Sequence, residues 1–254
     1  MENNVKLLDS WIRSCLSYPQ DQFFDQLMNK INDHCEVIKQ GSVRTFAEVK
    51  SNKNKLKGDL FEIMCFRLLR DGSLGIKCKN IWLFKDLPQD LRTYLSFSNK
   101  DVGIDIIIET ISEEWIAVQC KYRKKPNKSF RQTDNGPKRI SWQVNWKDLS
   151  TFYSLCERTG PHSTNSQEEP SKSGWKTYLV MTTAESVNRQ GRKGPKDKSI
   201  CIGSFKGLSK EAWFKFIGDT GNTLDKEKDT LDKEKDTLTL NELRLKRLAL
   251  FDKK

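Results

Sequence analysis

Hydrophobic residues recur at intervals of three and four along the first part of the chain, as in amphipathic helices. Residues 1–49 are predicted to be helical, with a break at Pro19, because a proline inside a helix removes a hydrogen bond and clashes with the preceding turn. The same spacing predicts a helix over residues 56–70, ending at Asp71-Gly72. We therefore expect a helical N-terminal lobe followed by a further helix.

Two short segments near the middle of the chain have the composition of β-strands. Residues 102–109 and 115–122 are rich in Ile, Val and aromatic side chains, and only residues 110–114 separate them. Two such runs are expected to pair as an antiparallel hairpin. If the turn is centred near Ser112, residues whose numbers sum to about 224 lie opposite each other.

Helices and strands alternate after this hairpin. Such alternation is typical of an α/β protein, so we expect a mixed central β-sheet flanked by helices on both faces. The pattern predicts a helix at 141–156, a polar surface loop at 162–174, strands at 178–182 and 200–202, and a helix at 210–217.

The composition changes at residue 219. The heptapeptide Thr-Leu-Asp-Lys-Glu-Lys-Asp occurs twice in succession, from Thr223 and from Thr230. Each repeat has one leucine, whereas a coiled coil needs two apolar positions in every seven. We divide the chain into a helical lobe (1–49), a core (50–218) and a charged tail (219–254), in which residues 238–251 have the pattern of an amphipathic helix.

The charge of the chain favours a polyanionic partner. The formal net charge is +11, and the tail has nine acidic and nine basic residues, so the whole surplus lies in residues 1–218. Such a surplus favours nucleic acid or a membrane surface. We find no run of eighteen apolar residues and no signal peptide, and the seven cysteines include no Cys-x-x-Cys pair. We expect an intracellular protein, cytoplasmic or nuclear and not secreted.

The predicted hairpin brings three polar side chains together. Side chains two apart on a strand share a face, so Gln119 and Lys121 point together, and the register places Asp105 opposite Gln119. Strands as apolar as these seldom carry such groups unless the groups are paired or bind something. This carboxylate, amide and ammonium form the candidate site.

These residues resemble the PD-(D/E)XK nuclease motif. Gly103-Ile104-Asp105, a hydrophobic strand and then Gln119-Cys120-Lys121 are similar to the variant of Mrr-like restriction endonucleases, in which a glutamine replaces the second acid. The resemblance covers about residues 56–217 and implies a restriction-endonuclease-like core. Its other segments are Lys57–Glu62, similar to the first core helix, and Trp146–Leu149 with Thr182-Thr183, similar to a later helix and strand.

The resemblance implies an endonuclease that hydrolyses DNA phosphodiester bonds with Mg²⁺, or with Mn²⁺ as a substitute. Asp105 would be the main metal ligand, helped by Gln119, the backbone carbonyl of Cys120 and Glu62. Oxygen ligands of this kind suit Mg²⁺. Lys121 would hold the attacking water and offset the charge that develops on the phosphate.

A basic segment follows Lys121. Seven basic residues and one acidic residue lie between positions 123 and 139. Phosphate contacts from such residues supply affinity without reading sequence. We predict a flexible DNA-binding loop that uses Arg123, Lys124, Lys125, Lys128, Arg131, Lys138 and Arg139.

Several alternatives stay open. Glu62 could be a solvated surface glutamate and Lys121 a charged residue on an edge strand. The neutral Gln119 is compatible with a catalytically inactive DNA-binding module of the same fold, and a structure-specific or RNA-directed nuclease is a third hypothesis. Besides DNA, the partners we consider are a second copy of the chain and a motor or helicase on a separate chain, with no membrane.

Overall fold

The computed structural model describes residues 2–37, 46–98, 103–126, 130–133, 136–140, 142–161, 174–189 and 194–218. Met1–Trp213 form one compact unit, and a second unit, Phe214–Lys254, is described as far as Gly218. The tail at 219–254 therefore lies outside the described residues, and the division at residues 49 and 218 stays a prediction.

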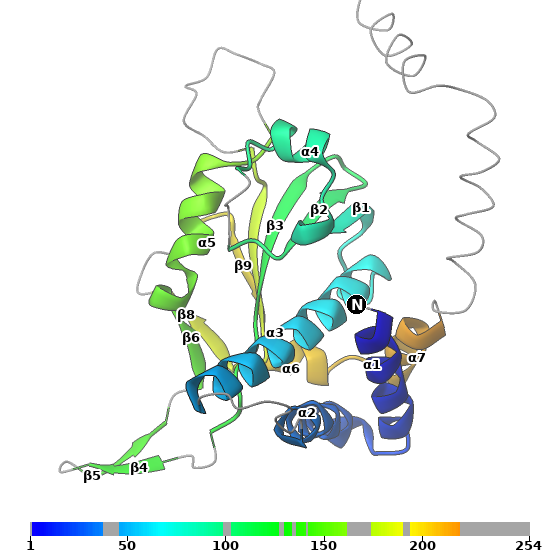
Figure 1. The fold of residues 1–254 in the computed structure, drawn as a ribbon, viewed down its shortest axis with the longest axis vertical. Coiled ribbons are helices and arrows are strands. Elements are labelled where there is room, and N and C mark those ends of the chain that lie inside the picture. The colour runs from blue at the N-terminus through cyan, green and yellow to red at the C-terminus, as the bar shows by residue number, and fades with distance from the viewer. Residues whose placement is uncertain are drawn as a thin grey trace, which may run out of the picture. The chain divides into compact units, whose positions relative to one another are not determined.

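A five-stranded mixed sheet is the centre of the protein (Figure 1). Its order is β1-β2-β3-β7-β9, in which β1, β2 and β3 pair antiparallel, whereas β3, β7 and β9 pair parallel. Helices flank this sheet, so the predicted α/β fold is confirmed. The strands are β1 (Cys78–Leu83), β2 (Ile106–Thr110), β3 (Trp115–Lys121), β7 (Thr177–Thr182) and β9 (Asp197–Ile200).

The β2–β3 hairpin has the register that the sequence predicts. Ile106 pairs with Val118, and both numbers sum to 224. The strand predicted from residue 102 is too long, because β2 begins at Ile106, after Gly103 with its φ of +121°. Asp105 thus lies just before the strand, where its N–H still donates to the carbonyl of Val118 (2.9 Å).

Helices α5 (Trp146–Arg158) and α3 (Phe46–Arg70) cover opposite faces of the sheet. On one face, Leu149, Phe152 and Leu155 of α5 share a buried cluster with Ile107, Ala117 and Val180. Ile106, Ile108 and Val118 alternate with that set and are fully buried on the other face, which α3 covers through contacts with β1 and β3. Burial of each such side chain stabilises the fold by roughly 1.5–3 kcal/mol.

The N-terminal helices pack on α3. The predicted break at Pro19 separates α1 (Glu2–Cys15) from α2 (Gln20–Val37). A buried ion pair joins Arg67 of α3 to Asp9 of α1 (2.5 Å), and Lys57 of α3 donates to Glu36 of α2 (3.0 Å). These contacts hold the helical lobe against the helix that carries Glu62.

Some predicted boundaries are wrong. Helix α3 begins ten residues before position 56, because good helix formers such as Lys, Ala and Glu extend it beyond its apolar stripe. The helix predicted from 141 begins at Trp146, where Asp148 accepts a hydrogen bond from the N–H of Asn145 (3.1 Å) as in a helix cap. Residues 143–145 are instead a strand, and the strand predicted at 200–202 ends at Ile200.

The basic segment after Lys121 contains a two-stranded ribbon, β4 (Phe130–Thr133) and β5 (Gly136–Arg139), where a flexible loop was predicted. Most of the loop predicted at 162–174 lies outside the described residues. No helix in the described part of the chain is long and apolar enough to cross a membrane. The remaining elements are η1 (Phe84–Asp86), α4 (Gln89–Tyr94), β6 (Gln143–Asn145), β8 (Ser186–Asn188), α6 (Ile202–Lys206) and α7 (Lys210–Gly218).

We predict that Gly103→Ala destabilises the protein by about 1–3 kcal/mol, because a left-handed backbone conformation strains a residue with a Cβ. The added carbon would also lie 3.3 Å from the backbone nitrogen of Phe152. The matched control is Gly58→Ala within α3, where the new Cβ has no described atom within 4 Å apart from its chain neighbours and the helix's own backbone. It should stabilise the protein by about 0.5–1 kcal/mol. Urea unfolding measures both, and equal effects of the two substitutions would contradict the prediction.

Candidate functional site

The candidate site lies at the point where β2 and β3 separate. Just before β2 begins, the side chain of Asp105 takes the position of a strand partner: its Oδ2 accepts a hydrogen bond from the backbone N–H of Cys120 on β3 (2.6 Å). The side-chain amide of Gln119 donates to the same oxygen. Because hydrogen bonds to a carboxylate are stronger than neutral ones, the half-buried Asp105 is held firmly against β3.

Lys121 lies at the end of β3, within electrostatic reach of two carboxylates. Burial raises the pKa of Asp105, and the Cys120 N–H and the positive charge of Lys121 oppose this increase. Burial also acts on Asp148, but its hydrogen bond to Arg123 and the charge of Lys121 bring the pKa of Asp148 below its ordinary value. The structure therefore brings Asp105, Gln119 and Lys121 together, as the hairpin register predicts.

Glu62 reaches Asp105 from α3. Its side chain is 21% exposed, and Lys85 Nζ lies 3.8 Å from it. Burial raises the pKa of Glu62 to about 7, and the negative charge of Asp105 adds to the increase. Asp59, one turn earlier on α3, raises the pKa of Glu62 as well. Two predicted site carboxylates thus lie close enough to repel each other.

Side chains on both faces of the sheet contribute to the candidate site. Cys120 interacts with Cys65 of α3, and Tyr122 contacts the ring of Phe61, so these side chains of β3 and its extension face α3. Strand alternation then places Gln119 and Lys121 on the opposite face, toward α5. Asp105 lies at the gap between the strands and interacts with both sides, with Gln119 and Lys121 on one side and with Asp59 of α3 on the other.

The donor atoms at this gap are compatible with a hard divalent cation. The predicted ligands Asp105 and Glu62 offer carboxylate oxygens, and Cys120 offers a backbone carbonyl; Mg²⁺ prefers such oxygens and commonly uses only one or two carboxylates. Gln119 does not present its oxygen to this gap as the other predicted ligands do, because its side-chain nitrogen faces Asp105 and the Cys120 carbonyl (3.4 Å). Among the described residues, no three His, Cys, Asp or Glu side chains are grouped closely enough to hold a metal by themselves.

Thr182 and Thr183, at the end of β7, fix the backbone that leaves β3. The hydroxyl of Thr182 donates to the carbonyl of Lys121 (2.7 Å) and accepts from the N–H of Ala184 (3.1 Å). The hydroxyl of Thr183 bonds both the N–H and the carbonyl of Arg123 (2.7 and 2.9 Å). The resemblance included both threonines without assigning them a role, and this positioning is a tertiary effect between segments about sixty residues apart.

Asp148 lies near the candidate site, and the sequence reasoning quoted it in the resemblance without giving it a role. It lies in the first turn of α5 and forms an ion pair with Arg123 (2.7 Å). A carboxylate three residues after an asparagine is a helix-capping pattern, so the sequence does mark the helix start. Its pairing with Arg123 depends on packing of α5 against the sheet.

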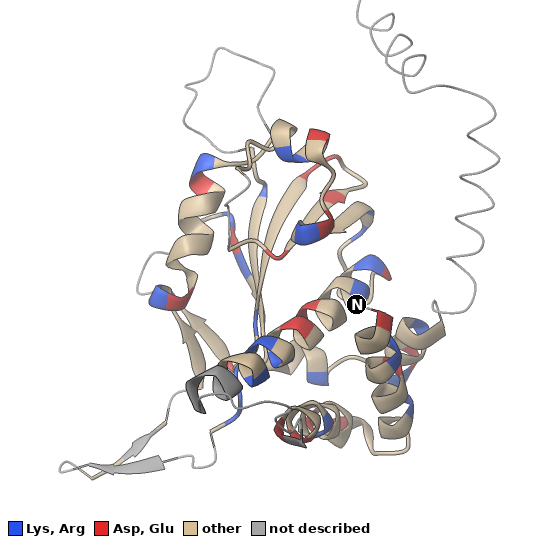
Figure 2. Cartoon of the chain, in the orientation of Figure 1, with Lys and Arg blue, Asp and Glu red and all other residues tan. Residues whose placement is uncertain are grey.

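The predicted DNA-binding residues have different surroundings. Arg123 is paired with Asp148, whereas Lys124 and Lys125 are exposed. Lys128 lies outside the described residues, and Arg131, Lys138 and Arg139 are placed by their backbone on β4 and β5. In Figure 2, α3 carries basic residues (blue) in its N-terminal half and acidic residues (red) further along the helix.

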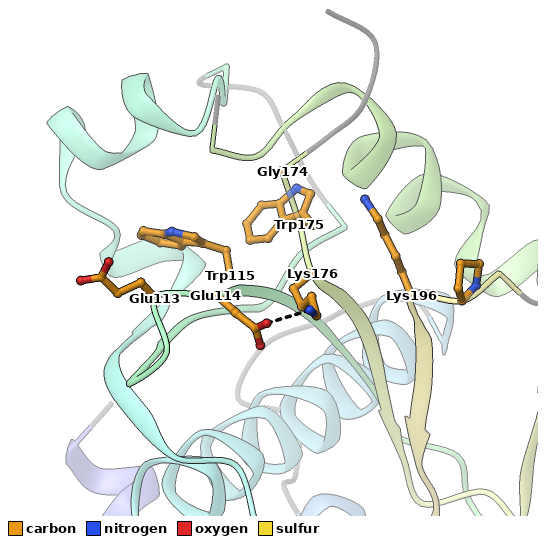
Figure 3. Close-up of a pocket in the computed structure, with 8 residues that line it drawn as sticks. Glu113, Glu114, Trp115, Gly174, Trp175, Lys176 and Lys196 are labelled. Carbon is orange, nitrogen blue, oxygen red and sulfur yellow. Dashed lines mark ion pairs between the residues drawn. The ribbon is translucent and has the colours of Figure 1, made fainter. Parts of the chain in front are cut away.

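A hollow of about 520 Å³ lies at the other end of β3 (Figure 3). Trp115 and Trp175 line it, and Lys176 pairs with Glu114 (2.7 Å) across it. Trp115 is six residues from Lys121, which corresponds to about 20 Å along a strand. This hollow is therefore separate from the Asp105 cluster.

Residues 70–135 match a family described as "Restriction endonuclease", of the Mrr catalytic type. This segment is similar to the restriction endonuclease family. It contains Asp105, Gln119, Cys120 and Lys121, while Glu62 lies just before it. The predicted Mrr-like resemblance is thereby confirmed.

One solved structure is similar to this chain: "ATP-dependent Type ISP restriction-modification enzyme LlaBIII bound to DNA", with 16% sequence identity and a TM-score of 0.36. The match covers 65% of this chain and 8% of the other, so this chain spans less than a tenth of that enzyme. Comparison with curated proteins gives no match.

We predict that Thr182→Val destabilises the protein by about 1–3 kcal/mol, because the Lys121 carbonyl and the Ala184 N–H lose a buried partner. The residue is fully buried, and valine preserves its shape. Thr182→Ser keeps the hydroxyl and is the matched control. Chemical denaturation compares the two, and a serine variant as unstable as the valine variant would show that the methyl group, not the hydroxyl, matters.

Proposed function

We propose that this protein is a metal-dependent endonuclease that hydrolyses DNA phosphodiester bonds. The observation that carries the proposal is the Asp105 carboxylate, bound to the backbone and amide of β3 beside the Lys121 ammonium. The restriction endonuclease family of residues 70–135 supports the same reaction class.

Each residue of the cluster has a chemical role in this proposal. Asp105, Glu62 and the Cys120 carbonyl would hold Mg²⁺, which when bound lowers the pKa of its water and neutralises charge on the phosphate. Lys121 donates hydrogen bonds to the attacking water and to the phosphate. Gln119, as a donor to Asp105, keeps that carboxylate oriented. Glu62 on its rigid helix closes the site from the opposite face.

A second candidate is a DNA-binding module without catalysis. The nitrogen of Gln119 stands where a second acid would offer an oxygen, which favours weaker metal binding. A structure-specific or RNA-directed nuclease shares the chemistry of the main proposal and differs only in substrate. A homodimer and a separate motor chain stay predictions.

We predict that the purified chain nicks or linearises supercoiled plasmid with Mg²⁺ or Mn²⁺ and is inactive in EDTA, because no metal then activates the attacking water or neutralises the charge that develops on the phosphate. Gel analysis of plasmid, linear, branched and RNA substrates defines the preference. DNA binding without cleavage in either metal would support the non-catalytic module and contradict the nuclease.

We further predict that Asp105→Ala and Lys121→Ala each lower the cleavage rate by at least about 10²–10³-fold, because each removes charge that acts in the transition state. DNA affinity should change little. The matched control is Glu109→Ala, an acid on β2 that pairs with Lys79 (2.9 Å), which should keep its activity. Affinity lost in parallel with cleavage would argue against catalytic roles.

A further inference from the structure

Arg123 is held in place by its backbone as well as by its side chain. Its N–H donates to the hydroxyl of Thr183 (2.7 Å), and its carbonyl accepts from that hydroxyl (2.9 Å) and from the indole nitrogen of Trp142 (3.3 Å). Thr183 is buried, and hydrogen bonds are stronger away from water. The side chain of Arg123 therefore starts from a fixed point two residues after Lys121.

Asp148 holds the guanidinium of Arg123 through one terminal nitrogen. Its Oδ1 lies 2.7 Å from Nη2 of Arg123, and its Oδ2 accepts a hydrogen bond from the N–H of Asn145 (3.1 Å). One carboxylate oxygen thus serves the ion pair and the other serves the cap of α5. Because a guanidinium has five N–H donors, this single contact leaves most of them for another acceptor.

The pair is placed where a nucleic acid strand at Lys121 can reach it. The side chains of Arg123 and Asp148 are 36% and 33% exposed, so both are partly open to solvent. Alternation along the extended chain puts Arg123 on the same face as Lys121, about 7 Å further on. One substrate strand can therefore contact both basic residues.

An arginine that is ordered before binding is a better phosphate ligand than a mobile one. Fixing a long side chain at an interface costs conformational entropy, and Asp148 supplies this ordering in the free protein. The planar guanidinium suits the task, because its fork of donors matches both carboxylate and phosphate. It can bind Asp148 at one nitrogen and a phosphate at the others.

We propose that Asp148 is a positioning residue for DNA binding, which holds the guanidinium of Arg123 so that its remaining donors bind a backbone phosphate next to the one at Lys121. The proposal rests on DNA being the substrate. It gives an acidic residue a favourable part in binding a polyanion, and it requires neither a metal nor cleavage.

Replacing Asp148 by asparagine distinguishes this role from that of a simple surface charge. Loss of an acid beside a polyanion normally strengthens binding, because it lowers electrostatic repulsion. If Asp148 positions Arg123, the same substitution weakens binding. Asparagine keeps an oxygen that can accept from the N–H of Asn145, so the cap of α5 is preserved.

The test measures binding of a DNA duplex by fluorescence anisotropy in EDTA, over a range of salt concentrations. The variants are Asp148→Asn, Arg123→Gln and the two combined. Asp148→Glu is the conservative variant, because it keeps the charge and glutamate is a usual residue at this position of a capping box. The matched control is Glu157→Gln, which removes an exposed acid from the same helix.

We expect Arg123→Gln to weaken binding about tenfold and to lower the slope of log K against log salt by about 1, the value for one lost phosphate contact. Asp148→Asn should weaken binding about three- to tenfold, because a long side chain must then be ordered on binding. Asp148→Glu should bind like the unmodified chain, and Glu157→Gln should bind as tightly or more tightly.

The combined variant shows whether Asp148 acts through Arg123. Once Arg123 is glutamine, Asp148→Asn should cause no further loss of affinity, because two residues that act through one contact are not additive. A general defect in folding would instead weaken binding equally with and without Arg123, so this comparison decides even if Asp148→Asn lowers the unfolding temperature.

Asp148→Asn binding as tightly as the unmodified chain, Asp148→Glu binding as weakly as Asp148→Asn, or no duplex binding by the unmodified chain would each overturn the proposal. The nuclease proposal fails separately. A chain that shows this pattern of binding but does not cut in Mg²⁺ would refute the nuclease and leave the role of Asp148 intact.

Discussion

The hydrogen bond from the Cys120 backbone to the Asp105 carboxylate connects the fold to its candidate chemistry. In a continuous β-ladder, a main-chain carbonyl of the neighbouring strand would accept the hydrogen bond from the Cys120 N–H of β3. Here Gly103 turns the chain away and β2 starts only at Ile106, so a side chain takes this place. A carboxylate is thereby half-buried at the edge of two apolar strands, where a cation is the group that best offsets its charge.

Packing on both faces of the sheet makes this arrangement rigid. α3 carries Glu62 to one side, and it is itself tied to the N-terminal helices by the buried Arg67–Asp9 pair. α5 carries Asp148 to the other side, where the Asp148–Arg123 pair and the threonines at the end of β7 hold the chain that follows Lys121. The helical lobe therefore contributes to the position of Glu62, although it supplies no proposed catalytic residue. Tyr122 adds a direct link, since its hydroxyl donates to Asn32 of α2 (2.9 Å).

Acidic and basic residues are separated along the candidate site: the carboxylates lie at the gap between β2 and β3, and the basic residues follow at the end of β3. Asp105 and Glu62 concentrate negative charge at the gap between the strands, and the basic residues begin immediately after it, at Lys121. In the proposed nuclease, these basic residues would attract a phosphodiester toward the end of β3. Arg123 is already engaged by Asp148 in the free protein. The exposed Lys124 and Lys125 offer further contacts.

The sequence by itself determined the hairpin, its register and the meeting of Asp105, Gln119 and Lys121, because strand periodicity and a short turn are local properties. It also determined the α/β class and the helices around Pro19. Only the tertiary structure decided that β2 starts at Ile106 and that Glu62 reaches Asp105 from the face opposite Gln119 and Lys121. The contacts of Asp148 and of Thr182 and Thr183 were decided there too. These features depend on which helix covers which face and on hydrogen bonds between segments far apart in the chain, and no local pattern of hydrophobic and polar residues encodes such pairings.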